Sequence, residues 1–255
     1  MPQESFLHRT KRLRVFAGPN GSGKSTLVKE LQKKYNLGFV VNADVICDQL
    51  RATGKLELEK FRLSTNQSEF LQFCQLPANA SFILKIGKPT FVVEDNCCIV
   101  DQTCPCNLSY NAALIAGFIR YQLCQSGLSF SYETVMSHRS KIDEIDDARK
   151  LGYRVYLYYV CLDSSEISVG RVQTRVKMGG HNVETCKIKS RYIHSLENLL
   201  PVLQLSHRAY LFDNSKIMNM VASFNENRLT LNEPVEQMPN WFSRYILEML
   251  ADDGD

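Results

Sequence analysis

The alternation of apolar and polar positions along the chain first predicts a strand, a glycine-rich turn, a helix and a second strand. Leu13–Ala17 is a short apolar run that ends at Gly18, which is typical of a buried strand. Ser25–Tyr35 carries apolar residues at helical spacing, and Gly38 follows it as a helix stop. Phe39–Val41 is the next strand. Because a crossover from strand through helix to strand is right-handed, this order predicts a parallel sheet.

The pattern of the middle of the chain is less regular. We expect a helix over Phe61–Phe73 and a hairpin that pairs Phe91–Val93 with Cys98–Val100 across Glu94-Asp95-Asn96. A helix rich in Ala and Ile over Tyr110–Leu123 and a strand over Leu128–Glu133 follow. Residues from about Arg51 to Asn107 therefore form an insertion in the strand and helix order.

The second half returns to clear alternation, with Tyr153–Val160 as its most distinct strand. Further elements are predicted around it: a helix over Ile142–Leu151, a helix after Asp163 with Glu166 as its capping partner, a helix over Glu184–Leu200 broken by Pro201, a final sheet strand over Arg208–Phe212, a hairpin over Ala222–Asn232 and a closing helix over Trp241–Leu250. The prediction is one α/β domain over the whole chain, with the insertion at about 51–107 and a C-terminal extension from about 215.

Composition adds few constraints. The 255 residues are 44% hydrophobic and the net charge is +3, so the charge balance points neither to nucleic acid nor to a membrane surface. No apolar stretch reaches transmembrane length and the start lacks a secretory signal. The nine cysteines are therefore expected as free thiols in a cytoplasmic protein.

The turn after the first strand carries the clearest chemistry. Its sequence fits the P-loop pattern G-x-x-x-x-G-K-[ST] in full: Gly18, Pro19, Asn20, Gly21, Ser22, Gly23, Lys24 and Ser25, followed by Thr26. Glycines let the backbone N–H groups turn inward towards phosphates, and the helix that follows presents its positive end. Lys24 is expected on the β- and γ-phosphates of ATP and the Ser25 hydroxyl on Mg²⁺. A switch ATPase and a kinase remain open on this motif alone.

A kinase also needs a carboxylate for the acceptor hydroxyl and cations for the moving phosphoryl group. Asp44 follows the second strand and is a candidate base, although it could equally cap the next helix. Glu133 ends a strand, where it could bind metal or substrate or simply face solvent. Arg171 and Arg175 share one helix face, and Lys187 and Arg191 repeat that spacing beyond Gly179-Gly180-His181. These faces predict either a phosphate-binding lid or a solvated basic surface.

Taken in order, several segments resemble the zeta-toxin-like P-loop kinases. They are the P-loop, Asn42-Ala43-Asp44, Ser129–His138, the Arg171–Val183 segment with its paired arginines and Gly-Gly-His, and Arg191–Leu199. The resemblance implies a P-loop kinase fold that phosphorylates a nucleotide-sugar such as UDP-N-acetylglucosamine on a hydroxyl. A toxin role would also need a neutralising antitoxin or regulatory partner.

By position, the resemblance makes Lys24 the phosphate lysine, Asp44 the base and Arg175 a lid arginine. It places further residues around acceptor and metal: Asn42, Glu133, Thr134 and His138. Where the family carries a second lid arginine this chain has Gly-Gly-His, so Arg171, His181 or Arg191 would replace it.

Two other groups have simpler interpretations. Cys97, Cys98, Cys104 and Cys106 are close enough to suggest zinc, but no C-x₂-C pair is present and free thiols are favoured. The basic segment from His8 to Arg14 has no interleaved aromatic residues, which argues against a nucleic-acid partner.

Overall fold

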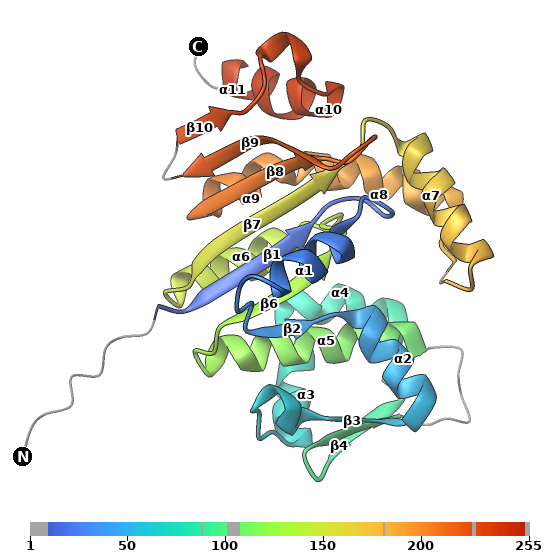
Figure 1. Ribbon diagram of the computed structural model, residues 1–255. Helices are drawn as coiled ribbons and strands as arrows, with labels where there is room; N and C mark the ends of the chain where they lie inside the picture. The colour runs from blue at the N-terminus through green and yellow to red at the C-terminus, as the bar shows by residue number, and fades with distance from the viewer. Residues whose placement is uncertain (1–9, 88, 101–107, 181, 226–227, 253–255) are drawn as a thin grey trace, which may run out of the picture.

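The computed structural model of the protein describes residues 10–87, 89–100, 108–180, 182–225 and 228–252 (Figure 1). Its centre is a seven-stranded sheet in the order β10-β9-β8-β7-β1-β6-β2. Five strands are parallel, namely β1 (Arg12–Ala17), β2 (Phe39–Val41), β6 (Phe130–Thr134), β7 (Arg154–Cys161) and β8 (Arg208–Asp213). Two antiparallel strands, β9 (Asn219–Asn225) and β10 (Arg228–Leu231), extend one edge. The fold is thus the predicted α/β class with a mostly parallel sheet.

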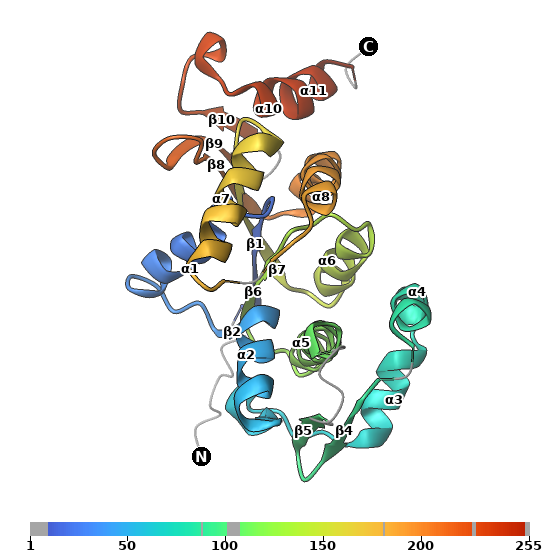
Figure 2. The same ribbon diagram turned by 90° about the vertical axis from the view of Figure 1, so that its right-hand side faces the viewer.

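Helices lie on both faces of the sheet (Figure 2). One face is covered in part by α1 (Lys24–Gln32), which packs on Phe16 and Val160. The opposite face carries α5 (Leu108–Gln125), α6 (Ser140–Lys150), α8 (Thr185–Glu197) and α9 (Leu199–Leu205). Apolar side chains of β1, β7 and β8 point into this second layer, which forms the main core. The strands are rich in Val, Leu and Tyr because both faces of a parallel sheet are normally covered.

The segment predicted as an insertion forms a small layer of its own beside α5. It consists of α3 (Gln67–Gln75), α4 (Pro77–Ile86) and a three-stranded sheet of β3 (Lys55–Glu57), β5 (Cys97–Val100) and β4 (Phe91–Glu94), and it follows α2 (Ala43–Thr53), which also packs on α5. The predicted hairpin of β4 and β5 is confirmed. Asp95 and Asn96 both have positive φ, 47° and 57°, as a two-residue hairpin turn requires.

Three helix predictions are wrong in detail. The helix expected over 61–73 begins only at Gln67, because Asn66 and Glu69 form a capping box. The helix α7 (Ser165–Lys177) is capped by the Ser164 side chain, and Glu166 plays no part in that cap. The helix expected to run to Leu200 ends at Glu197, so the predicted break is present but lies at Asn198; Pro201 is in the first turn of the next helix, α9.

At the C-terminal edge, β8 is not the final strand of the sheet, because β9 and β10 continue it. The predicted terminal hairpin and closing helix are both present, the latter as consecutive turns over Asn240–Phe242, Ser243–Leu247 and Glu248–Asp252. Trp241 is buried against Tyr159, and its Nε1 donates to Asp213 Oδ2 at 3.0 Å. These contacts fasten the C-terminal segment to the end of β8.

Candidate functional site

The P-loop connects β1 to α1 in a conformation that requires its glycines. Gly18, Gly21 and Gly23 have φ of 135°, 71° and 102°. A Cβ at Gly18 would lie 2.0 Å from the carbonyl oxygen of Val160, and one at Gly23 would lie 2.5 Å from Asn214 Nδ2. Only glycine combines these backbone angles with so close an approach.

Lys24 folds back over the loop. Its Nζ donates to the carbonyl oxygens of Gly18 at 2.8 Å and Pro19 at 2.7 Å. Burial lowers the pKa of this ammonium to about 8, against the raising effects of nearby Glu133 and Asp44. A partly desolvated cation held at the mouth of the loop is suited to bind a polyphosphate.

Two buried polar atoms of the P-loop bear on whether a triphosphate fits the site. Among the described residues, Asn20 Oδ1 and Ser22 Oγ are buried without a hydrogen-bond partner. A buried hydroxyl that makes no hydrogen bond costs about 1–3 kcal/mol, and a phosphate oxygen would accept from the Ser22 hydroxyl. Together with the glycine cradle and Lys24, this donor fits a phosphate ligand.

Glu133 joins the P-loop to the end of the neighbouring strand. Its Oε2 accepts from Ser25 Oγ at 2.6 Å, and its Oε1 accepts from Asn42 Nδ2 at 2.7 Å. Ser25 and Asn42 follow β1 and β2, and Glu133 lies near the end of β6; these carboxyl ends meet because β6 lies between the other two strands. A hydroxyl and a carboxylate are ligands that Mg²⁺ accepts, so Ser25 and Glu133 together could hold that ion.

Asp44 lies in the first turn of α2, beside this junction. Asn42 rather than Asp44 caps the helix: its Oδ1 accepts from the backbone N–H groups of Asp44 at 2.8 Å and Val45 at 3.3 Å. The Asp44 side chain is exposed, and it is close enough to raise the pKa of Lys24. Of the two roles left open for Asp44, capping falls to Asn42.

Thr134 and His138 lie further along the same edge. Thr134 Oγ1 accepts from Met136 N at 2.9 Å within a tight turn, where Met136 has a φ of 58°. The exposed His138 ring pairs its Nδ1 with Ser140 Oγ at 2.8 Å at the start of α6. Both bonds are local, and neither of them joins these residues to Glu133 or to the P-loop.

Arg171, on α7, forms hydrogen bonds to the P-loop and to the loop after β8. Its guanidinium donates to the carbonyl oxygens of Gly21 at 3.4 Å, Asn214 at 2.7 Å and Ser215 at 3.3 Å. Asn214 Nδ2 in turn donates to Ser22 O at 2.8 Å. The sequence analysis missed Asn214 as a site residue, and its only signal was its position directly after a predicted strand.

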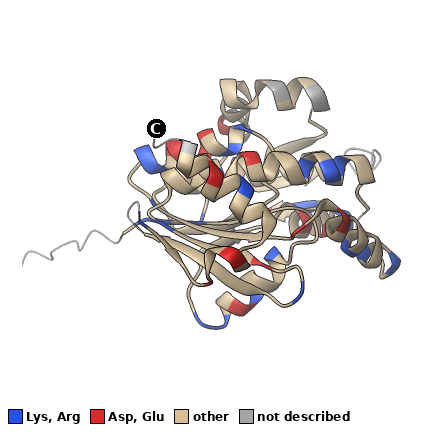
Figure 3. Ribbon diagram, turned by 90° about the horizontal axis from the view of Figure 1, so that it is seen from above, with Lys and Arg blue, Asp and Glu red and all other residues tan. Residues whose placement is uncertain are grey.

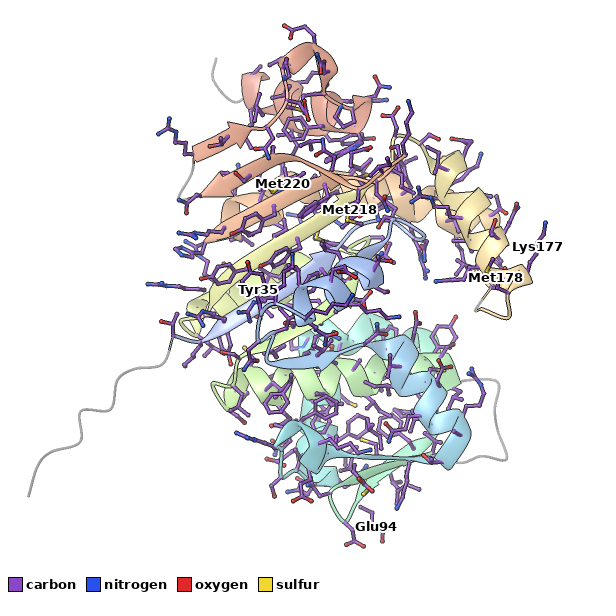
Figure 4. The ribbon with its side chains drawn as sticks, in the orientation of Figure 1. Tyr35, Glu94, Lys177, Met178, Met218 and Met220 are labelled. Atoms are coloured by element: carbon purple, nitrogen blue, oxygen red, sulfur yellow. The ribbon has the colours of Figure 1, made fainter. Side chains whose placement is uncertain are left out.

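Arg175 stands one turn further along α7. Its positive charge is among the influences that lower the pKa of Lys24, so the two cations share one region. A Cβ on Gly180 would lie 2.6 Å from Arg175 Cγ, so this glycine lets the arginine side chain pass. The helix projects from the P-loop end of the sheet, with basic residues along its outer part (Figure 3) and Lys177 and Met178 at its tip (Figure 4).

The second basic face of the predicted lid carries Lys187 and Arg191 on α8. Lys187 pairs with Glu184 on its own helix at 3.0 Å, and Arg191 is exposed. His181 lies outside the described residues, as do Cys104 and Cys106 of the suggested zinc cluster. Among the side chains that the structure places, no three metal-binding groups gather. Cys98 is instead buried in the small sheet, where burial raises its pKa to about 12.

Comparison with known proteins identifies the fold. No protein-family model matches the chain. An uncharacterized protein of Haemophilus influenzae is 34% identical over 65 residues, which are 26% of this chain and 46% of that protein. A chain of the AvrRxo1-ORF1:-ORF2 complex with ATP matches with a TM-score of 0.52 and 15% identity, over 88% of this chain and 61% of that chain. The same complex with sulphate ions gives a TM-score of 0.50 and 16% identity, over 88% and 62%.

A chain from the PezAT chromosomal toxin-antitoxin system of Streptococcus pneumoniae aligns over 99% of this chain and 91% of that chain, at 13% identity and a TM-score of 0.49. This chain spans less than two thirds of the length of the Haemophilus protein and of the AvrRxo1 chain. At such identities the similarity shows the fold, which is of the P-loop kinase-like type. None of the helices in the described part is long and apolar enough to cross a bilayer.

Proposed function

We propose that the protein is an ATP- and Mg²⁺-dependent kinase that transfers the γ-phosphoryl group to a hydroxyl of a small acceptor, most simply a nucleotide-sugar such as UDP-N-acetylglucosamine. The observation that carries the proposal is the junction at Glu133, which ties Ser25 of the P-loop to Asn42, two residues before Asp44. A P-loop serine beside a strand-end carboxylate is the arrangement that holds Mg²⁺ in P-loop proteins, and the nearby Asp44 supplies the further carboxylate that a kinase needs for the acceptor hydroxyl.

Each residue then has a role that its position supports. Lys24 would neutralise charge on the phosphates, and Arg175 would approach the same charge from α7. Asp44 would accept the proton of the attacking hydroxyl, because it is exposed and lies on the same side as Lys24. Asn214 and Arg171 would hold the loop in its binding conformation. When bound, Mg²⁺ would supply charge neutralisation between the donor phosphates.

The nucleotide-sugar acceptor rests on the resemblance of the Asn42–Asp44 and Ser129–His138 segments to zeta-toxin-like kinases. A protein partner also belongs to the proposal, because a chain of similar fold was crystallised in the two-protein AvrRxo1-ORF1:-ORF2 complex with ATP. Co-expression with the product of a neighbouring gene would test that partner.

The reaction is tested by incubating the protein with ATP, Mg²⁺ and a panel of UDP-sugars, NAD, nucleosides and a short oligonucleotide, followed by mass spectrometry. A new mono-phosphorylated product supports the proposal, and the product names the acceptor. A phosphorylated oligonucleotide would instead make the protein a polynucleotide kinase. Tight ATP binding with no phosphorylated product from any acceptor would favour a nucleotide-dependent switch.

The catalytic assignment is tested with Asp44→Asn. We expect loss of transfer by about 10²–10⁴-fold, the usual contribution of a general base, with ATP affinity nearly unchanged. The matched control is Asp48→Asn, one turn along α2, where an exposed carboxylate bonds only to Arg51. Undiminished turnover in Asp44→Asn would refute the base assignment.

A further inference from the structure

In the part of the chain that the structure describes, one half of the central sheet carries no helix on the side that α1 occupies. In Figure 1, which faces that side, α1 lies over β1, and no described helix lies over β7, β8, β9 or β10. The contacts agree: α1 packs on Phe16 and Val160, and Tyr158 and Phe212 lie at the margin of that cluster. We call the uncovered part the open face and define it by six residues, Arg14, Tyr156, Tyr158, Arg208, Tyr210 and Arg228.

Strand register places these six side chains on one surface. Arg14 pairs with Tyr156, Tyr156 pairs with Arg208, and Tyr158 pairs with Tyr210. Asn225 pairs with both Arg208 and Arg228. Because directly paired residues of neighbouring strands point to the same side, one row crosses five strands from β1 to β10. Four inter-strand steps of about 4.8 Å make this row roughly 19 Å long.

The aromatic rings of the open face form a ladder. Phe16 and Tyr158 stack with centroids 4.8 Å apart, and Tyr158 and Tyr210 stack at 5.1 Å. The Arg14 guanidinium lies 5.8 Å from the centre of the Tyr156 ring. Tyr158 is thus covered on both ring faces, by Phe16 and by Tyr210. Tyr156 and Tyr210 are partly exposed, and among the described residues no further ring stacks on either of them.

The charge of the open face is uniformly positive. Arg208 and Arg228 are exposed, as are Arg12 and Arg154 at the same edge of the sheet, where they pair with each other. At the registered positions of this face on β1, β7, β8, β9 and β10 there is no Asp or Glu. A surface of arginines without carboxylates attracts a polyanion.

We propose that the open face binds single-stranded nucleic acid. Arginines along the face would hold the phosphates, and the uncovered ring faces of Tyr156 and Tyr210 would stack unpaired bases. A duplex keeps its bases stacked inside, so such ring faces select single strands. No local pattern in the chain indicates this face, because its basic residues and tyrosines lie on strands that are far apart in the sequence.

The open face is separate from the acceptor side of the P-loop and does not depend on phosphoryl transfer. At its other end it reaches the loop after β8: Met218 Cε would be 3.2 Å from a Cβ on Gly23, and Met220 pairs with Phe212 (Figure 4). Bound nucleic acid would therefore lie beside the P-loop helix, on the opposite side of it from Asp44 and the small sheet.

The test is fluorescence anisotropy with a labelled uridine oligomer of about twelve nucleotides, a duplex of the same length and heparin as a polyanion without bases. Salt is varied from about 50 to 200 mM. We expect binding of the single strand that weakens with salt, and at least tenfold weaker binding of the duplex.

Two double variants separate charge from stacking, and a third is the control. Arg208→Gln with Arg228→Gln should weaken binding and reduce the salt slope by about 1.4, since each phosphate contact to a single strand contributes about 0.7. Tyr156→Leu with Tyr210→Leu removes two stacking positions and should weaken binding by about 30-fold or more, with an unchanged slope. Arg149→Gln with Lys150→Gln removes the same charge from exposed positions on α6 and should leave binding as it was.

Several results would overturn the proposal. One is that the single strand shows no binding at about 100 µM protein, and another is that the duplex and the single strand bind equally well. A control variant on α6 that loses as much affinity as the open-face variants would also contradict it. If heparin binds as tightly as the oligomer and the tyrosine variants bind normally, the open face binds anions in general and does not recognise bases. A change of oligomeric state in the open-face variants without any nucleic-acid binding would assign the face to a second copy of the chain. Melting temperature and circular dichroism of each variant show that it is folded.

Discussion

Glu133→Gln is the substitution that examines the candidate site most directly. The side chain keeps its shape but loses its charge, so Asn42 can still donate to the remaining oxygen, and Ser25 can accept from the new amide. The bonds at 2.6 and 2.7 Å change from charge-assisted to neutral. That change costs about 1 kcal/mol for each bond, hence about 2 kcal/mol in the free energy of unfolding. For a chain of this size the melting temperature should fall by roughly 4–8 °C.

The functional effect should be much larger than the structural one. Loss of one preorganised electrostatic group typically lowers turnover by about 10²–10³-fold. Glu133 is also the first of the groups that raise the pKa of Lys24, so the variant should hold a more weakly protonated lysine. Both effects weaken the site for a magnesium-bound triphosphate.

The assay needs no acceptor. A fluorescent ATP analogue is titrated against the parent and the variant, with Mg²⁺ and with EDTA. We expect Mg²⁺ to tighten binding to the parent and to change the affinity of Glu133→Gln by less than about twofold, because one oxygen ligand of the ion has lost its charge. Turnover is compared once the acceptor is known.

The control is Glu166→Gln on α7, where an exposed carboxylate pairs with Lys189 at 2.9 Å. Surface ion pairs contribute little, so its melting temperature and nucleotide affinity should match the parent. Equal Mg²⁺ dependence in Glu133→Gln and the parent would refute the role of Glu133, and so would an equal loss in the control.

Three other predictions follow from single contacts. Above its pKa of about 8, Lys24 loses its charge, so the affinity for ATP should fall by about tenfold from pH 7 to pH 9, and Lys24→Arg should remove this pH dependence. Because folding lowers the pKa of Lys24 from 10.5 to about 8, the free energy of unfolding should rise with pH between these two values. Gly18→Ala should lower the free energy of unfolding by about 3 kcal/mol and abolish ATP binding in calorimetry, since its Cβ would meet the Val160 carbonyl at 2.0 Å; a fully active variant would contradict the cradle geometry. Trp241→Phe removes the bond to Asp213 and should cost about 1–2 kcal/mol in a urea titration, with an unchanged transition taken as refutation.

Much of the fold was predictable from the sequence, because local patterns and local chemistry agree. The parallel strands, the P-loop between β1 and α1 and the β4–β5 hairpin all follow from short-range apolar runs, glycines and turn residues. The helix limits were less predictable: Asn66 and Ser164 compete with neighbouring residues as caps, and only the folded backbone decides which side chain reaches the free N–H groups.

The P-loop follows from local sequence alone, because its glycine spacing and Lys24 act within one turn of the chain. Tertiary structure alone decided that Glu133 bonds both Ser25 and Asn42, because strand order puts β6 between β1 and β2. It also decided that Asn214 supports the P-loop from almost two hundred residues away. The open face arises in the same way, since neighbouring strands of a parallel sheet bring together side chains that no local pattern relates.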